Sequence, residues 1–223
     1  MKKFERSFMK FFVQVGIAII ILNLTACITK PTQSLSTKRI YIYKDDVSSE
    51  NRVYWTNIIM MVPNGATPVS LIRDFTTGDE SNPFAGRGES IRIDFELKPK
   101  EWAGVAVASC PDCWGQKPCP QPPAVYMDIG GATRLVFYAR GERGGEVIEA
   151  KVAILGNQPC GDSTLLPAES GYIRLTNEWK EYSICLKYFN LSRVITPFAI
   201  FVVGKHNQQS VRVFLDEIYF EIP

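Results

Sequence analysis

The sequence predicts an all-β protein, a two-sheet antiparallel β-sandwich, that follows a short N-terminal export segment. Three observations lead to this prediction. From residue 38 onward, short runs of alternating apolar and polar residues are separated by Gly, Pro, Asn and Asp. No stretch in that region has a sustained helical periodicity. The one long apolar run lies near the start of the chain, at residues 11–22.

The first 26 residues are interpreted as a signal peptide. Four basic residues precede the apolar run, which is the order of an export signal. The run is shorter than the roughly 20 apolar residues that a membrane-spanning helix needs, so a permanent transmembrane helix is the weaker interpretation. Leu24-Thr25-Ala26-Cys27 follows and resembles the lipobox of bacterial lipoproteins. A plain secretory signal with a chance cysteine is the alternative.

The lipobox resemblance implies that the chain is cleaved before Cys27 and that acyl chains on Cys27 anchor it to the lipid bilayer. The expected location is the cell envelope. Ile28 rather than an aspartate follows the cysteine. In lipoproteins of this kind, that implies sorting to the outer membrane if the organism has one.

The remaining chain is expected to comprise a lipidated tether, 27–37, and one sandwich domain, 38–223. Removing residues 1–26 takes four of the 25 Lys and Arg residues and one of the 23 Asp and Glu residues. The mature chain is therefore almost neutral. Because a phosphate backbone demands a basic surface, nucleic acid is excluded as an expected partner.

Eight segments of the domain have the alternation and the β-branched or aromatic content of strands. Within the segment 134–140, Leu135, Phe137 and Ala139 share one face and are expected to face the core. The predicted strands are 39–44, 90–97, 105–109, 134–140, 147–154, 181–186, 198–203 and 211–221.

A two-residue turn at Gly144 and Gly145 is predicted to pair two of these strands as a hairpin, because glycine tolerates positive φ. This register places Arg140 opposite Glu149, and Tyr138 opposite Lys151, all pointing away from the core. An ordinary cross-strand ion pair is one interpretation of Arg140 and Glu149. A polar floor for a ligand on the outer sheet face is the other.

Several phrases of the sequence resemble, in the correct order, a family of jelly-roll carbohydrate-binding modules found in bacterial surface proteins and glycoside hydrolases. The resemblance spans residues 39–223, nearly the whole mature chain. The phrases are Asn-Pro-Phe-Ala-Gly at 82–86, Trp-Ala-Gly-Val at 102–105, residues 131–142 with Ala-Arg-Gly-Glu at their end, Gly-Gly-Glu at 144–146, residues 175–182 with Glu-Trp-Lys-Glu-Tyr, and Leu-Asp-Glu-Ile-Tyr at 215–219.

This resemblance implies a galactose-binding-like sandwich that holds glycan on a concave sheet face or at loop tips. It also implies a structural calcium ion, for which Asp216 and Asp45 or Asp46 are the candidate ligands, with carbonyl groups of residues 82–86. The alternative role of Asp216 is a hydrogen-bonded aspartate that orders the last strand.

Sugar binding requires exposed aromatic rings beside planar polar groups. Trp114, in a loop rich in Pro and Cys, is the first candidate for stacking on a sugar ring. A structural role, in which Trp114 covers a sheet edge, is an equally weighted alternative. Trp102 and Trp179 lie beside strand starts and are interpreted as core aromatics. The candidate ligand-binding residues are Trp114, Tyr126, Tyr138, Arg140 and Glu149.

The five cysteines after Cys27 are an odd number, so at least one is expected to stay free or to pair between molecules. In an exported domain, disulfides are expected among Cys110, Cys113, Cys119 and Cys160. A tetrahedral zinc site made by the same four thiolates is the alternative. Cys185, within an apolar strand, is the expected leftover thiol.

The predicted function is that of a non-catalytic glycan-binding lipoprotein which holds polysaccharide at the cell envelope, alone or for a partner enzyme. A scaffold that binds another envelope protein through the same fold is the first alternative. A carbohydrate-active enzyme is the second, because two of Asp128, Glu146, Glu149 and Asp162 can in principle form a glycosidase pair. His206, the only histidine, lies in a polar segment that is predicted to be a hairpin loop, which argues against a catalytic triad.

Overall fold

The computed structural model describes residues 37–44, 58–86, 88–109, 126–158 and 160–223. All of them belong to one compact unit, Thr37–Pro223, and Met1–Ser36 form a separate unit. The predicted signal peptide, Cys27 and most of the tether therefore lie outside the described residues. Among the described residues, no helix has the length and apolar character needed to cross a membrane.

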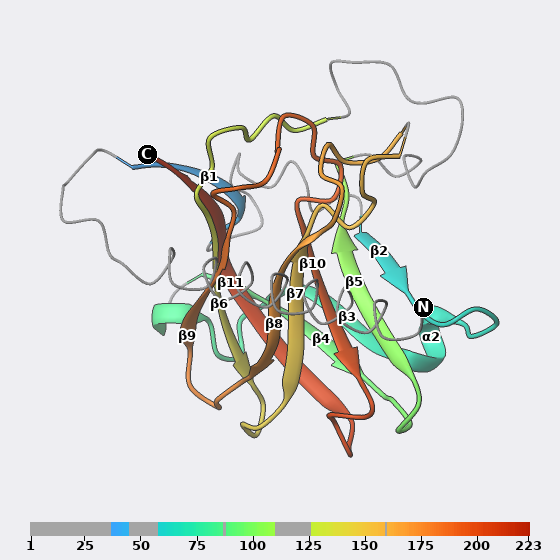
Figure 1. Ribbon diagram of the computed structural model, residues 1–223. Helices are drawn as coiled ribbons and strands as arrows, with labels where there is room; N and C mark the ends of the chain where they lie inside the picture. Colours follow the sequence, from blue (N-terminus) through green and yellow to red (C-terminus); the bar gives the residue numbers. More distant parts are fainter. Residues whose placement is uncertain (1–36, 45–57, 87, 110–125, 159) are drawn as a thin grey trace, which may run out of the picture. The chain divides into compact units, whose positions relative to one another are not determined.

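The described chain forms two antiparallel sheets, so the predicted β-sandwich is confirmed (Figure 1). We call them sheet A and sheet B. Sheet A has the order β3 (Ile72–Asp79), β4 (Ser90–Phe95), β11 (Val211–Ile222), β6 (Arg134–Gly141) and β9 (Lys180–Cys185), and β1 (Lys38–Tyr43) also pairs with β11. Sheet B has the order β2 (Ile58–Met61), β5 (Trp102–Val107), β10 (Phe198–Val203), β7 (Val147–Val152) and β8 (Ala168–Arg174). The short helices are α2 (Pro68–Leu71) and η2 (Phe84–Gly86).

One continuous hydrophobic core lies between the two sheets. Leu135, Phe137 and Ala139 of β6 are fully buried in it, as their alternation predicts. Phe198, Ile200 and Val202 of β10 approach from sheet B. The residues that alternate with these therefore point away from the core, and they form the outer faces of the sandwich.

All eight predicted strands occur in the structure. The strand predicted at 105–109 begins earlier, at Trp102, and ends at Val107. Strands β2, β3 and β8 were not predicted. Each of them lies at an edge of its sheet, where half of the backbone ladder is unpaired and the sequence pattern is weaker.

The predicted hairpin between β6 and β7 is wrong. Strand β6 pairs with β9 and β11, whereas β7 pairs with β8 and β10 in the other sheet. The glycines do adopt positive φ, 82° at Gly144 and 98° at Gly145. However, the backbone N–H groups of Gly141 and Gly145 donate to the carbonyl groups of Thr176 and Leu175, so this segment crosses from one sheet to the other. Arg140 and Glu149 consequently lie on different sheets and do not pair.

Candidate functional site

A row of cross-strand neighbours runs over the outer side of sheet B. The register pairs Met61 with Gly104, Gly104 with Phe201, Phe201 with Glu149, and Glu149 with Tyr172. Trp102 lies on the same side of β5, two residues before Gly104. We call the surface formed by Met61, Trp102, Gly104, Phe201, Glu149 and Tyr172 the aromatic face.

Phe201 lies against the backbone of β5 at the centre of this face. A Cβ atom on Gly104 would come within 2.6 Å of Phe201 Cδ1, so only glycine leaves room for the ring. The Trp102 and Phe201 ring centroids are 6.1 Å apart. Trp102 is 37% exposed and Tyr172 is 59% exposed. The face therefore combines a ring packed onto the sheet with two partly exposed rings, Trp102 on the adjacent strand β5 and Tyr172 two strands away on β8.

Charged groups lie directly beside these rings. Lys151 Nζ is 2.7 Å from Glu169 Oε1 and 3.2 Å from Glu149 Oε2, and it lies 5.5 Å from the Phe201 ring centroid. Although burial alone lowers the pKa of Lys151, its hydrogen bonds to Glu169 and Glu149 outweigh that effect and hold the pKa above its ordinary value. Lys151 is thus a fixed cation that orients two carboxylates along the face.

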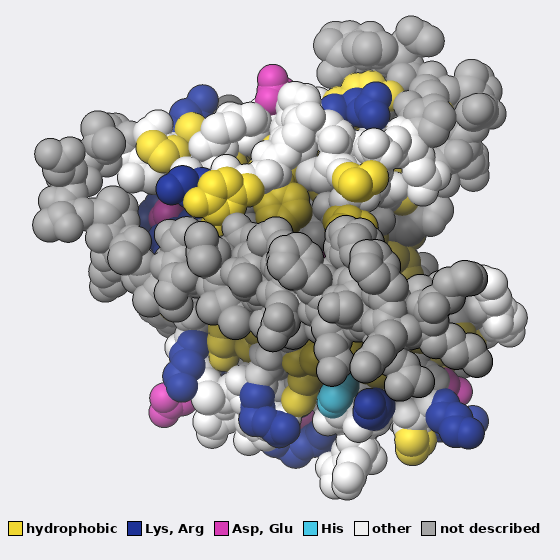
Figure 2. All heavy atoms as spheres, in the orientation of Figure 1, with side chains coloured by type: hydrophobic (Ala, Val, Ile, Leu, Met, Phe, Trp, Pro, Cys, Tyr) yellow, Lys and Arg dark blue, Asp and Glu magenta, His cyan; other side chains and the backbone are white. Residues whose placement is uncertain are grey.

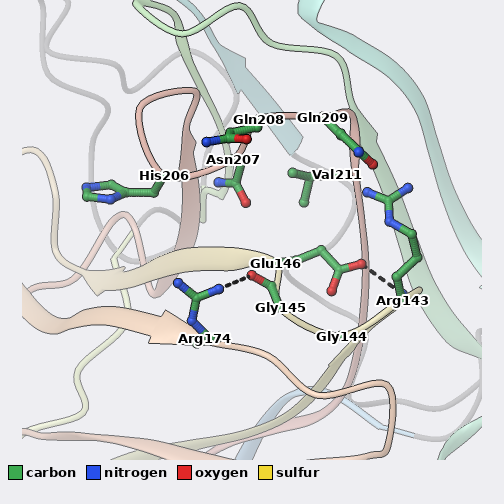
Figure 3. Close-up of a pocket in the computed structure, with 10 residues that line it drawn as sticks. All are labelled: Arg143, Gly144, Gly145, Glu146, Arg174, His206, Asn207, Gln208, Gln209 and Val211. Atoms are coloured by element: carbon green, nitrogen blue, oxygen red, sulfur yellow. Dashed lines mark hydrogen bonds between the residues drawn. The ribbon is translucent and has the colours of Figure 1, made fainter.

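A hollow of about 360 Å³ lies at one end of the sandwich, where the β6–β7 connection meets the β10–β11 connection (Figure 3). We call it the end hollow. Asn207 holds it together, because its side chain accepts the N–H of Val147 at 2.9 Å and donates to the carbonyl of Val147 at 2.8 Å. Its lining residues are Arg143, Gly144, Gly145, Glu146, Arg174, His206, Asn207, Gln208, Gln209 and Val211.

Tyr138 and Arg140 point outward from sheet A, on the side opposite to the aromatic face. The Phe84 ring covers Tyr138, with centroids 4.1 Å apart. The Arg140 guanidinium lies 3.6 Å from the Phe214 ring centroid and 5.3 Å from that of Trp179. Burial lowers the pKa of Arg140. These two predicted site residues therefore share a covered surface. Of the predicted ligand-binding residues that the structure describes, only Glu149 lies on the aromatic face.

Tyr126 and Trp114 are the other two candidates. Tyr126 is half-buried against Ile195, with the Arg193 guanidinium 5.6 Å from its ring centroid. Trp114 falls outside the described residues, so its role stays a prediction.

Neither Trp102 nor Trp179 is a core residue, so that interpretation is wrong. Trp179 lies on the outer side of sheet A, where its indole N–H donates to the carbonyl of Asn82 at 3.2 Å. Trp102 begins β5 with its side chain turned away from the core. Sequence reasoning also missed Phe201 and Tyr172. The alternation in 198–203 already placed Phe201 on the face of the strand opposite to that of Ile200 and Val202. A search for aromatic residues that point outward would have found it.

Asp216 is completely buried next to the segment that the calcium prediction named. Its carboxylate accepts the N–H groups of Phe84, at 3.3 Å, and of Glu217, at 2.8 Å. No group of three potential Asp, Glu, His or Cys ligands occurs among the described residues. Because Asp45 and Asp46 lie outside them, the calcium site stays a prediction.

Cys185 is not a free thiol in the structure, so its assignment as the leftover cysteine is wrong. Its neighbour Ile184 points into the core, so Cys185 lies on the opposite side of the edge strand β9, at its end. Cys160 is not free either. Cys110, Cys113 and Cys119 lie outside the described residues, and their pairing, or a zinc site, stays a prediction.

Three of the four candidate catalytic carboxylates have local structural contacts. Asp162 is fully buried and accepts four hydrogen bonds, from the N–H groups of Leu155, Ile195 and Thr196 and from the Thr196 hydroxyl. Asp128 accepts the N–H of Gly130 within a turn. Glu146 accepts the N–H of Arg143 at 2.8 Å. Glu149 alone faces the outer side of sheet B, in its ion pair with Lys151.

No protein-family model matches the sequence, and no curated protein matches it. Solved structures do. The family 30 carbohydrate-binding module of a cellulosomal cellulase of Clostridium thermocellum aligns with a TM-score of 0.50 and 12% identity, over 82% of this chain and 96% of that chain. Another crystal structure of a family 30 carbohydrate-binding module aligns with a TM-score of 0.51 and 12% identity, over 82% and 98%. The predicted jelly-roll fold of carbohydrate-binding modules is thereby confirmed.

Proposed function

We propose that this protein is a non-catalytic, lipid-anchored glycan-binding protein that holds polysaccharide at the cell envelope through the aromatic face. The arrangement of Trp102, Phe201 and Tyr172 beside the Lys151 ion-pair cluster is the observation that carries the proposal. Aromatic rings offer apolar surfaces to the C–H faces of sugar rings, and fixed charged groups meet hydroxyl groups at defined positions.

The dimensions of the face suit an extended sugar chain. Phe201 and Tyr172 are separated by two strand-to-strand steps, or about 10 Å at the usual spacing of neighbouring strands. This is roughly the length of a disaccharide. Because Trp102 lies two residues along the neighbouring strand, the rings are spread over the sheet instead of forming one closed pocket. A polymer can therefore cross the face without ending in it.

Binding to immobilised polysaccharides tests the proposal. We expect the purified chain to be retained on one class of glycan. We expect Tyr172→Ala to lower the affinity about tenfold, because tyrosine is among the few residue types whose truncation at a binding site often costs more than about 1 kcal/mol, and about 1.4 kcal/mol corresponds to tenfold. Tyr188→Ala is the matched control, since Tyr188 is also well exposed, at 63%, but lies beyond the end of β9. Equal losses in the two variants would place the site elsewhere.

The lipid anchor is the second part of the proposal, and the lipobox at residues 24–27 supports it. Acyl chains on Cys27 would keep the glycan-binding domain at the membrane surface. Metabolic labelling with a fatty acid should mark the wild-type chain and not Cys27→Ala. A labelled Cys27→Ala chain would contradict the assignment of the anchor.

Binding to another envelope protein is the second candidate function. Leu165 and Leu166 are consecutive and are 75% and 68% exposed, in the connection between β7 and β8. Exposed leucines in one loop favour contact with another apolar surface. This function would be favoured if the purified chain bound no polysaccharide and co-purified with one envelope protein.

A further inference from the structure

The end hollow adjoins the aromatic face through β8. Tyr172 and Arg174 lie on the same side of this strand, because residues two apart in a strand share a face. The Tyr172 ring also contacts His206 of the hollow lining, with ring centroids 4.3 Å apart. A sugar chain that contacts Tyr172 therefore lies next to the hollow.

The accessible charge of the hollow is positive. Arg174 donates to the carbonyl of Gly145 at 2.9 Å and has no acidic partner among the residues that the structure describes. Arg143 donates to the carbonyl of Ser210 at 2.6 Å, and its nearest acidic group, Glu142, is 4.0 Å away. In Figure 3 the two arginine side chains lie on opposite sides of the hollow. Figure 2 shows further Lys and Arg side chains gathered at this end of the molecule.

The one acidic residue of the lining does not neutralise this charge toward solvent. Glu146 is only 4% exposed, and one of its carboxylate oxygens accepts the N–H of Arg143. The other oxygen lies against Gly141, where an added Cβ atom would come within 1.9 Å of it. The buried carboxylate thus shapes the β6–β7 connection, while the two guanidinium groups and the amides of Gln208 and Gln209 line the open side.

We propose that the end hollow binds the carboxylate of an acidic sugar unit whose neighbouring units stack on the aromatic face. Guanidinium groups bind carboxylates through paired, charge-assisted hydrogen bonds, and side-chain amides add neutral donors. The inference rests on the proposed function and names its substrate class: an acidic polysaccharide rather than a neutral one. Because the arginines are partly exposed, the added affinity decreases as the salt concentration rises.

Paired probes test this inference with the full-length chain. Polygalacturonate and hyaluronan are each compared with their carboxyl-reduced, neutral forms in a binding titration at low salt. We expect at least one acidic form to bind about tenfold more tightly than its reduced form, and we expect Arg174→Gln to abolish most of that ratio. Lys180→Gln removes the same charge from the exposed edge strand of sheet A and should leave the ratio unchanged.

The possible failures are distinguishable. Equal affinity for the acidic and the reduced form of each polymer overturns the inference while the proposed glycan binding stands. A preference for acidic forms that Arg174→Gln and Lys180→Gln lower equally also overturns it, because the preference then reflects net charge alone. Both proposals are supported if Tyr172→Ala weakens binding of both the acidic and the reduced form, while Arg174→Gln removes only the preference for the acidic form. No binding of either acidic polymer overturns the inference whether or not neutral glycans bind.

Discussion

Gly104 shows how a single residue can determine the candidate site. Its missing side chain allows the Phe201 ring to lie against the backbone of β5, at the centre of the aromatic face. In the sequence this glycine is only one of four residues in the Trp-Ala-Gly-Val phrase. Its role depends on a partner almost 100 residues later, which the register of β5 and β10 brings opposite to it. Local pattern reasoning does not contain that information.

Tyr219 gives the protein a predictable sensitivity to alkaline pH. It is 3% exposed, and burial raises its pKa to about 12, although the Arg39 guanidinium over its ring acts in the opposite direction. The folded state therefore keeps the phenolic proton at pH values where the unfolded chain has lost it. The resulting stability is complete below pH 10 and is lost as the pH rises from about 10 to about 12.

We expect Tyr219→Phe to flatten the decline in unfolding free energy over this pH range by about 2 kcal/mol, because one pKa unit corresponds to about 1.4 kcal/mol. Urea unfolding followed by circular dichroism at pH 9, 10, 11 and 12 measures the slope. Tyr188→Phe replaces an exposed tyrosine and should leave the slope as it is in the wild type. An unchanged slope in Tyr219→Phe would show that other groups cause the decline.

At the level of elements, Asn207 joins the connection between β10 and β11 to the start of β7. Its amide nitrogen donates to the carbonyl groups of Val147, at 2.8 Å, and Val203, at 3.2 Å, and its amide oxygen accepts the N–H of Val147 at 2.9 Å. Asn207→Asp removes the donor and turns a carboxylate oxygen toward two buried carbonyl oxygens. We expect a loss of about 3 kcal/mol in unfolding free energy, because each unsatisfied buried polar group costs about 1–3 kcal/mol.

The matched control is Asn190→Asp. Asn190 is exposed, and its side-chain oxygen only accepts, from the N–H and the hydroxyl of Ser192. Since an aspartate retains that acceptor, the change should be within about 0.5 kcal/mol of the wild type. Urea midpoints measure both variants. Similar midpoints for the two would mean that Asn207 does not hold the β10–β11 connection in place.

Alternation in the sequence predicted every strand that has neighbours on both sides, and the three strands that it missed, β2, β3 and β8, all lie at sheet edges. Strand β9, also at an edge, was predicted. Strand β8 contains Gly171 at φ +67° and alternates poorly, because its outer residues meet solvent and its pairing with β7 is shifted near Glu149. The β6–β7 segment failed for another reason. Its glycines have the dihedral angles of a tight turn, but pairing with distant strands, not the turn, decides which sheet each strand joins.

At the level of the whole molecule, the sequence predicted the sandwich better than the position of the candidate site. Tyr138, Arg140 and Glu149 all point outward, as their parity requires, yet the two sheets present them on opposite sides of the sandwich. A period of two separates inside from outside within one strand. It does not tell which outer face a strand contributes to, because that depends on the topology.

Asp216 leads to a prediction for the whole fold, since it lies on β11, the strand that joins β1, β4 and β6. Its contact with the N–H of Phe84 ties the segment over sheet A to this central strand. We propose that calcium binds there together with Asp45 or Asp46. A ligand that binds only the folded state raises its stability in proportion to the logarithm of its concentration. We therefore expect a chelator to lower the Tm by about 5 °C, and we expect added calcium, but not zinc, to restore it.

Asp216→Asn tests whether the ion depends on this carboxylate. Asparagine removes the charge that a hard cation prefers, and it keeps only one of the two oxygens that accept the N–H groups of Phe84 and Glu217. This variant should melt at the same temperature with and without chelator, below the value of the chelated wild type because one hydrogen bond is also lost. A thermal scan of both proteins in chelator, calcium and zinc provides the comparison. If the wild-type Tm does not respond to chelator, Asp216 acts only through its hydrogen bonds, and the jelly roll is complete without a metal ion. If zinc alone restores the Tm, the ion instead belongs to the cysteine-rich loop.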